Sequence, residues 1–353
     1  MAQKNEIPVL LASIVITASL LGGGYWLLTQ KMGLDLNRLI QPNASPVRNS
    51  PTTTASKTPQ AATFQQVANV PPGLFSYGGS TTWAPIRRDV DRVITSNLGN
   101  FQLRYTEPTT GAPGSSIGIK MLLNNQLAFV QSSRSIKTEE YEDAQRRGFT
   151  LKEIPVAIDG IAIGINPNLN VRGLTVDQLR DIYLGKLTNW NQVGGPNLAI
   201  TPYSRRIEEG GTIEFFVENV LEGKPFGPTV QWIATTTEAL RAVSANPGGL
   251  YYASAPELVP QCTVKPLPIG RNVSELVAPY TEPLIATSAC PSQRNQLNST
   301  AFQNGSYPIT RRLFVIVKQN GQVDQQAGEA YANLLLTDQG QELITRSGFV
   351  RIR

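Results

Sequence analysis

Two long apolar runs constrain the fold of this chain more than any other feature. One is EIPVAIDGIAIGIN at 153–166, and the other is YPITRRLFVIVK at 307–318. Runs of this kind are typical of strands that are buried on both faces of a sheet. Each is long enough to pass from one lobe of a protein into another. We therefore predict two lobes that share these strands, with a ligand cleft between them.

From residue 73 onward, short apolar runs alternate with helical patterns, which predicts an α/β fold. The stretch LTVDQLRDIYLG illustrates a predicted helix. Thr175 and Gln178 have the spacing of a capping box, and Gly185 is placed to end the helix. Proteins of this class bind ligands in a cleft next to helix N-termini.

Four segments between these elements share one design. They lie at 78–82 (GGSTT), 114–116 (GSS), 131–134 (QSSR) and 205–212 (RRIEEGGT). Each combines hydroxyls with glycine or arginine, and helix starts add unpaired N–H groups and partial positive charge. Any one of them could be ordinary capping and turn chemistry. Together they favour an oxyanion site, and because none has a lysine at P-loop spacing they do not predict nucleotide triphosphate binding.

Asp159 is a carboxylate inside an apolar run, where it is costly without partners. It has two interpretations. It could be a turn residue between two strands, with Gly160 supplying the bend, or an acceptor at the cleft. A tetrahedral anion that still carries a proton can donate to a carboxylate, whereas fully ionised sulfate is repelled. The second interpretation therefore predicts selectivity against sulfate.

Composition excludes several classes of function. The 353 residues include no histidine, which removes Ser-His-Asp and Cys-His catalysis and every histidine-containing metal site. The net charge of +5 comes without a stripe of basic and aromatic residues, so nucleic-acid binding is not expected. The sequence has no cluster of acidic residues that would predict a metal site, and we expect no cofactor. A phosphohydrolase with a Ser or Thr nucleophile is the remaining enzyme alternative.

The N-terminus predicts a membrane segment followed by a linker. Residues 7–30 carry no charge and reach the ~20 residues that span a bilayer. We favour an uncleaved signal-anchor over 1–31 because no clean cleavage site follows; a cleaved signal peptide is the alternative. Residues 32–70 are rich in Pro, Ser and Thr and predict a linker, and 71–353 form the globular part.

The two cysteines, Cys262 and Cys290, lie in the globular part. In an exported domain they would pair across a loop, and in the cytosol they would be buried thiols. We favour the disulfide.

Several segments resemble the PstS-like substrate-binding proteins of phosphate ABC transporters, in the order that this family shows. They are GGSTTWAP at 78–85, PGSSIGIKMLLN at 113–124, SSRSI at 132–136, VAIDGIAIGIN at 156–166, LTVDQLRDIYLGKLTNWNQVGG at 174–195, SRRIEEGGT at 204–212, GSYPITRRLFVIV at 305–317 and LLTDQGQELITRSGFV at 335–350.

The resemblance implies a type II periplasmic binding protein, a two-lobed Venus-flytrap. The lobes would comprise about 71–158 with 307–353, and about 159–306. It implies a monomer and not an enzyme, which binds inorganic phosphate outside the cytoplasmic membrane and delivers it to an ABC permease. A sensor or scavenger of phosphate or another oxyanion, without transport, is the alternative within the binding class. The segment 260–304 receives no role.

Carried over position by position, the resemblance implies a set of phosphate ligands. They are Thr81, Thr82, Ser115, Ser133, Asp159, Arg206, Gly210, Gly211 and Thr212. Arg206 is preferred to Arg205 because its spacing to Thr212 matches the family. The family has Gly-Ser-Gly-Thr where this chain has Glu209-Gly210-Gly211-Thr212. One lost neutral hydrogen bond costs about 1 kcal/mol, which predicts weaker binding rather than none.

Overall fold

A computed structural model describes residues 61–207 and 210–352. The predicted signal-anchor at 1–31 and most of the predicted linker lie outside these residues. No helix within the described ranges is long and apolar enough to cross a membrane.

A mixed sheet runs through both lobes. Its central strands are β12 and β4, which pair antiparallel, and β13 and β9 also pair with β4. The order along the sheet is β2 (Phe101–Tyr105), β1 (Gly73–Gly79), β3 (Phe129–Ser132), β12 (Thr310–Gln319), β4 (Thr150–Ile165), β8 (Gly249–Ser254), β6 (Thr201–Ser204) and β7 (Gln231–Trp232), with β13 at Val350–Arg351 and β9 at Lys265–Leu267.

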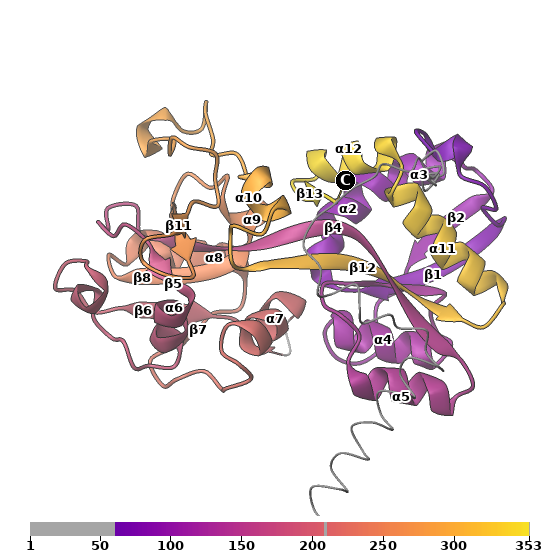
Figure 1. Ribbon diagram of the computed structural model, residues 1–353, viewed down its shortest axis with the longest axis horizontal. Coiled ribbons are helices and arrows are strands. Elements are labelled where there is room, and N and C mark those ends of the chain that lie inside the picture. Colours follow the sequence, from indigo (N-terminus) through magenta and orange to yellow (C-terminus); the bar gives the residue numbers. More distant parts are fainter. Residues whose placement is uncertain (1–60, 208–209, 353) are drawn as a thin grey trace, which may run out of the picture. The chain divides into compact units, whose positions relative to one another are not determined.

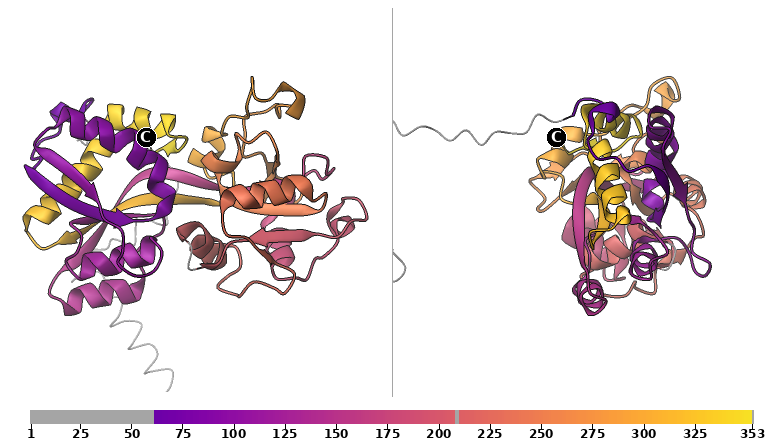
Figure 2. Two further views of the ribbon diagram at one scale, coloured as in Figure 1. Left: turned by 180° about the vertical axis from the view of Figure 1, so that it is seen from behind. Right: turned by 90° about the vertical axis from the view of Figure 1, so that its right-hand side faces the viewer.

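Strand β4 belongs to both lobes. From Thr150 to Gly160 its residues pair with β12, and from Ile161 to Ile165 they pair with β8. Figures 1 and 2 show β4 and β12 running side by side from one group of elements to the other. The predicted two-lobed α/β fold with a shared strand is thus confirmed. Because β4 continues without a break through Asp159, the interpretation of that residue as part of a turn is wrong.

The first lobe has a core on each face of its sheet. Along β12, Leu313, Val315 and Val317 enter one core while Phe314 and Ile316 enter the other. This period of two is what a strand buried on both faces requires. The covering helices are α2 (Ala84–Ile86), α3 (Arg92–Asn97), α4 (Ser115–Leu123), α5 (Thr138–Arg146), α11 (Val323–Leu335) and α12 (Asp338–Arg346).

The second lobe has one large core, which includes Ile161, Ile163, Tyr252 and Tyr307. Tyr307 and Ile309 lie in this core just before β12 begins, so the segment 307–318 also connects the two cores. The other elements of this lobe are β5 (Leu174–Thr175), α6 (Val176–Tyr183), α7 (Gly211–Asn219), α8 (Thr236–Ala245), α9 (Ala255–Leu258), β10 (Ile269–Gly270), β11 (Leu276–Val277) and α10 (Ser299–Gln303).

The predicted capping box of α6 is confirmed. The Thr175 hydroxyl accepts from the Gln178 N–H at 3.1 Å, and the Gln178 side chain accepts from the Thr175 N–H at 2.9 Å. Gly185, just beyond the helix, has a φ of +78°, a left-handed conformation that glycine adopts without strain.

The segment 260–304 reaches the boundary between the lobes. Cys262 and Cys290 form a disulfide within it, with sulfurs 2.09 Å apart. At its end, the ring of Phe302 covers Gly160, where an added Cβ would lie 2.8 Å from the ring. Gly160 therefore has to be glycine for this segment to pack against the shared strand.

The globular part begins before residue 71, where the sequence predicted a linker. Phe64 is fully buried in the core of the first lobe. Its N–H donates to the Gln339 side chain at 3.0 Å, and the Ala62 carbonyl accepts from the Gln339 N–H at 3.0 Å. The polar composition of the stretch predicted a linker, but a single aromatic ring is enough to anchor it to the core of the first lobe.

We predict that Phe64→Ala lowers the free energy of unfolding by about 3–5 kcal/mol, as expected for a buried aromatic ring. A domain that starts at residue 71 should lose a similar amount relative to one that starts at 61. Urea unfolding measures both, and Leu74→Ala, at a side chain that is 58% exposed, is the control. Equal stability of the two domains would contradict the packing of Phe64.

Candidate functional site

A buried ion pair lies where the shared strands pass between the lobes. Asp159 on β4 and Arg311 on β12 are direct partners in the antiparallel ladder. Arg311 Nε and Nη2 donate to Asp159 Oδ2 at 3.0 and 2.8 Å, and the Ser254 hydroxyl donates to Oδ1 at 2.7 Å. Burial raises the pKa of Asp159 and outweighs the opposing effects of Arg311 and Ser254. Both carboxylate oxygens are thus already hydrogen-bonded to the protein.

Arg311 also joins the two lobes. Its Nη2 donates to the hydroxyl oxygens of Thr82, in the first lobe, at 3.1 Å and of Thr212, in the second, at 2.9 Å. Its Nη1 donates to the Gly211 carbonyl at 2.9 Å. Because a guanidinium can only donate, both threonine oxygens must accept from it. Their own protons are then available to groups other than Arg311.

Three buried serines form a second cluster behind Gly211. The Ser80 hydroxyl donates to Ser133 Oγ at 2.9 Å, and Ser115 Oγ lies 3.3 Å from Ser133 Oγ. The Ser133 N–H donates to Ser115 Oγ at 3.1 Å. A Cβ added at Gly211 would lie 2.4 Å from Ser133 Oγ, so a larger residue there would push α7 away from the serines.

A polar network in the first lobe supports this cluster. The Ser80 N–H donates to the Gln131 carbonyl at 2.8 Å, and the Gln131 side chain donates to the Tyr331 hydroxyl at 2.7 Å. Tyr331 and Tyr77 then donate to Asp91 at 2.7 and 2.5 Å. Burial raises the pKa of Asp91 to about 6 although both tyrosines donate to it. The loop at Ser80 is therefore fixed through side chains as well as through β1.

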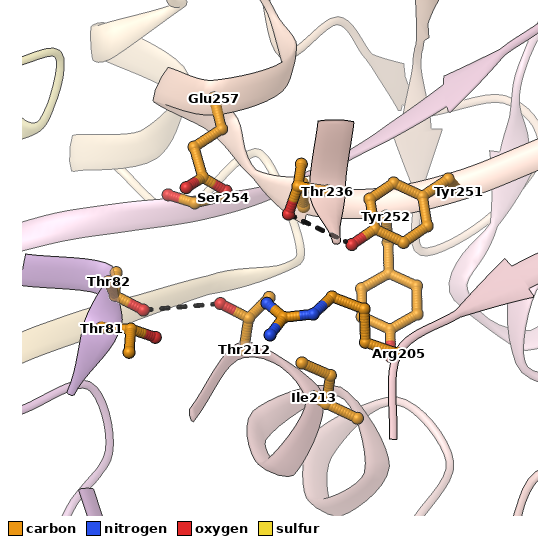
Figure 3. Close-up of a pocket in the computed structure, with 11 residues that line it drawn as sticks. Thr81, Thr82, Arg205, Thr212, Ile213, Thr236, Tyr251, Tyr252, Ser254 and Glu257 are labelled. Carbon is orange, nitrogen blue, oxygen red and sulfur yellow. Dashed lines mark hydrogen bonds between the residues drawn. The ribbon is translucent and has the colours of Figure 1, made fainter. Parts of the chain in front are cut away.

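A cavity of about 120 Å³ opens beside Thr82 and Thr212 (Figure 3). The N-terminus of α7 is next to it, and Gly210 before the helix has a φ of +148°, which favours glycine. Helix starts carry unpaired N–H groups and partial positive charge. The lining residues are Thr81, Thr82, Arg205, Thr212, Ile213, Thr236, Tyr251, Tyr252, Ala253, Ser254 and Glu257.

Most of the predicted ligand residues come together here, but in two layers. The cavity is lined by Thr81, Thr82 and Thr212. The remaining residues pack behind it or beside it, namely Ser115, Ser133, Asp159, Gly210 and Gly211.

Arg206 does not join the other predicted residues. Its exposed guanidinium lies 5.3 Å from the centre of the Trp232 ring. Arg205 lines the cavity instead, and its Nε donates to the Ala234 carbonyl at 3.2 Å. The preference for Arg206 rested on spacing along the chain, and spacing does not fix which of two adjacent side chains faces inward.

Sequence reasoning missed Arg311, Ser254 and Glu257. For Arg311 a signal was present, because two adjacent arginines interrupt an otherwise apolar strand. Alternation along β12 buries Arg311 and exposes Arg312. For Ser254 and Glu257 no local pattern was available, since they become neighbours of the site only when β8 pairs with β4. Among the described residues, no group of acidic and cysteine side chains is arranged to hold a metal.

Comparison with known proteins places the chain in a family. Residues 50–339 match the PBP superfamily domain. The chain belongs to this family. Among curated relatives, it is 25% identical to the phosphate-binding protein PstS of Staphylococcus epidermidis over 272 residues, which are 74% of each protein. It is 26% identical to Protein SphX of Synechococcus elongatus over 299 residues, 81% of this chain and 79% of SphX.

Solved structures share the fold. An ABC-type phosphate transport receptor from Vibrio cholerae superposes with a TM-score of 0.59 at 21% identity, over 79% of this chain and 99% of the receptor. PstS from Borrelia burgdorferi superposes with a TM-score of 0.54 at 22% identity, over 79% of this chain and 99% of PstS. At these identities the likeness concerns the two-lobed architecture.

We predict that Asp159→Leu and Arg311→Met each lower the free energy of unfolding by about 3–5 kcal/mol, because each leaves a buried charge unpaired. The double variant should lose less than either single variant, since it removes both charges. Urea unfolding of the four proteins gives the coupling energy. Arg346→Met, which breaks an exposed pair with Glu342, is the control and should change little. Additive losses would show that the pair is not coupled.

Proposed function

We propose that this chain binds inorganic phosphate outside the cytoplasmic membrane and delivers it to the permease of an ABC transporter. One observation carries the proposal: the hydroxyls of Thr82 and Thr212 both accept from Arg311 at the wall of a cavity, beside the start of α7. Hydroxyl protons, a guanidinium and a helix N-terminus together suit a dehydrated oxyanion. The names of the curated relatives support phosphate as that anion.

The proposed ligands divide according to the two layers. Thr81, Thr82, Thr212 and Arg205 would contact the anion in the cavity. The N–H groups at Gly210 and Gly211 would contribute from the start of α7. The hydroxyls of Ser115 and Ser133 would reach the anion if α7 withdrew from them on lobe opening. Asp159 would act through Arg311.

We propose lobes of about 71–158 with 307–353, and about 159–306, with the first lobe extended back to residue 61. The exchange of partners along β4 next to Asp159 supports the division, and the burial of Phe64 supports the extension. The hydroxyl oxygens of Thr82 and Thr212 lie 3.4 Å apart, so the two lobes already meet beside the proposed position of the anion. We propose a monomer that binds its ligand without converting it, so phosphate release from a phosphomonoester should not be detected.

We also propose that 1–31 is an uncleaved signal-anchor and that the residues after it link the anchor to a domain on the outer side. The charge-free stretch at 7–30 and the disulfide support this topology. The full chain should remain with membranes after alkaline carbonate extraction, and a chain without 1–31 should not. A mature N-terminus beyond Gly24, read by mass spectrometry, would instead support the cleaved signal peptide.

Calorimetry on residues 61–353 tests the binding proposal, with one phosphate site expected. We predict that Arg205→Ala weakens phosphate affinity by about tenfold to a hundredfold, because a charge-assisted contact at the cavity is lost. Arg206→Ala, the matched control on the adjacent arginine, should change affinity little. A larger loss for Arg206→Ala would restore the choice made from sequence spacing, and no phosphate binding by the wild-type domain would contradict the proposed function.

A further inference from the structure

Selectivity for a protonated anion needs a carboxylate that can still accept a hydrogen bond from the ligand. Asp159 was the candidate from the sequence, but in the structure its carboxylate is already hydrogen-bonded to other side chains. Its Oδ2 accepts twice from Arg311 and its Oδ1 accepts from Ser254. Asp159 is also 1% exposed and does not line the cavity. A carboxylate that accepts from the anion would therefore have to be a different one.

Among the described residues that line the cavity, Glu257 is the only carboxylate. It lies in α9, directly after β8, and Figure 3 shows its carboxylate turned toward Ser254. The residue keeps a solvent-exposed surface, while its carboxylate lies close enough to protein atoms to lose part of its hydration. This partial burial, together with the charge of Asp159, raises the pKa of Glu257, and Arg311 and Arg205 act in the opposite direction.

Three other polar side chains of the cavity are suited to donate, whereas Ser254, whose proton goes to Asp159, is left to accept. Arg311 makes Thr82 and Thr212 accept from it, which leaves their two protons for the anion or for the 3.4 Å contact between the two hydroxyls, and Arg205 has only donors. These donors cannot distinguish phosphate from sulfate, because both anions present oxygen atoms that accept hydrogen bonds. A difference arises only where the ligand itself has to donate. Hydrogen phosphate has one P–OH group for this purpose, and sulfate has none.

We infer that Glu257 accepts the proton of the bound anion and thereby discriminates against oxyanions that carry no proton. The inference rests on the proposed function and specifies the selectivity of the same site. An ionised carboxylate next to a sulfate oxygen repels it and leaves an acceptor without a donor, so the wrong anion is rejected by an unfavourable contact. Asp159 has a different role, since it holds Arg311 and through it the two threonines.

The test is competition calorimetry on residues 61–353 in mildly alkaline buffer, where hydrogen phosphate and sulfate carry the same charge. Glu257→Gln should weaken phosphate binding and strengthen sulfate binding, so that the ratio of the two affinities falls by about tenfold to a hundredfold. Arsenate, which keeps a proton, should follow phosphate, and selenate should follow sulfate. This pairing separates the effect of the proton from that of ion size.

Two further variants make the result specific. Glu275→Gln, at an exposed carboxylate of the same lobe outside the cavity, should leave the ratio unchanged. Asp159→Asn should weaken both anions together. The inference is overturned if Glu257→Gln keeps the wild-type ratio, or if Asp159→Asn alone abolishes it. Wild-type protein that binds none of the four anions would contradict the proposed function itself, which is a distinguishable outcome.

Discussion

The ion pair between Asp159 and Arg311 is the interaction on which the rest of the site depends. Both residues lie on the strands that connect the lobes, and they pair directly across the ladder. A buried charge pair of this kind is stable only with near-complete hydrogen bonding. Arg311 meets that requirement with acceptors from both lobes, Thr82 on one side and Thr212 with the Gly211 carbonyl on the other. The requirement of Arg311 for hydrogen-bond acceptors thus fixes the positions of Thr82, Gly211 and Thr212.

This arrangement explains why the site can be neutral and still suit an anion. Asp159 offsets the charge of Arg311, and the hydroxyl oxygens of Thr82 and Thr212 already accept hydrogen bonds from Arg311. Attraction for an anion then comes from oriented dipoles, from Arg205 and from the start of α7. The Asp159–Arg311 pair thus adds no net charge to the site, and Arg205 is the charged donor at the cavity. Discrimination between anions has to come from an acceptor such as Glu257.

The sequence was sufficient for the parts of the structure that depend on local pattern. The apolar period of the shared strands, the capping box at Thr175 and the hydroxyl-rich corners are local, and they could be recognised without knowing the fold. Arg311 could not be assigned, because its partner Asp159 is 152 positions away and is found only through strand pairing. The sequence also could not decide which of Arg205 and Arg206 faces the cavity, for a related reason. Both follow the end of β6, where the alternation of a strand no longer tells which side chain turns inward.

Gly210 shows how a departure from family pattern acquires a different meaning in the structure. From the sequence, the glycine looked like the loss of one serine hydroxyl. With a φ of +148° the backbone at this position is one that a serine would rarely adopt. A Cβ placed there would also lie 3.2 Å from the Thr81 hydroxyl oxygen. The space of the missing side chain therefore borders a hydroxyl of the first lobe. A side chain at this position would crowd the Thr81 hydroxyl, so the glycine allows the two lobes to approach each other closely here.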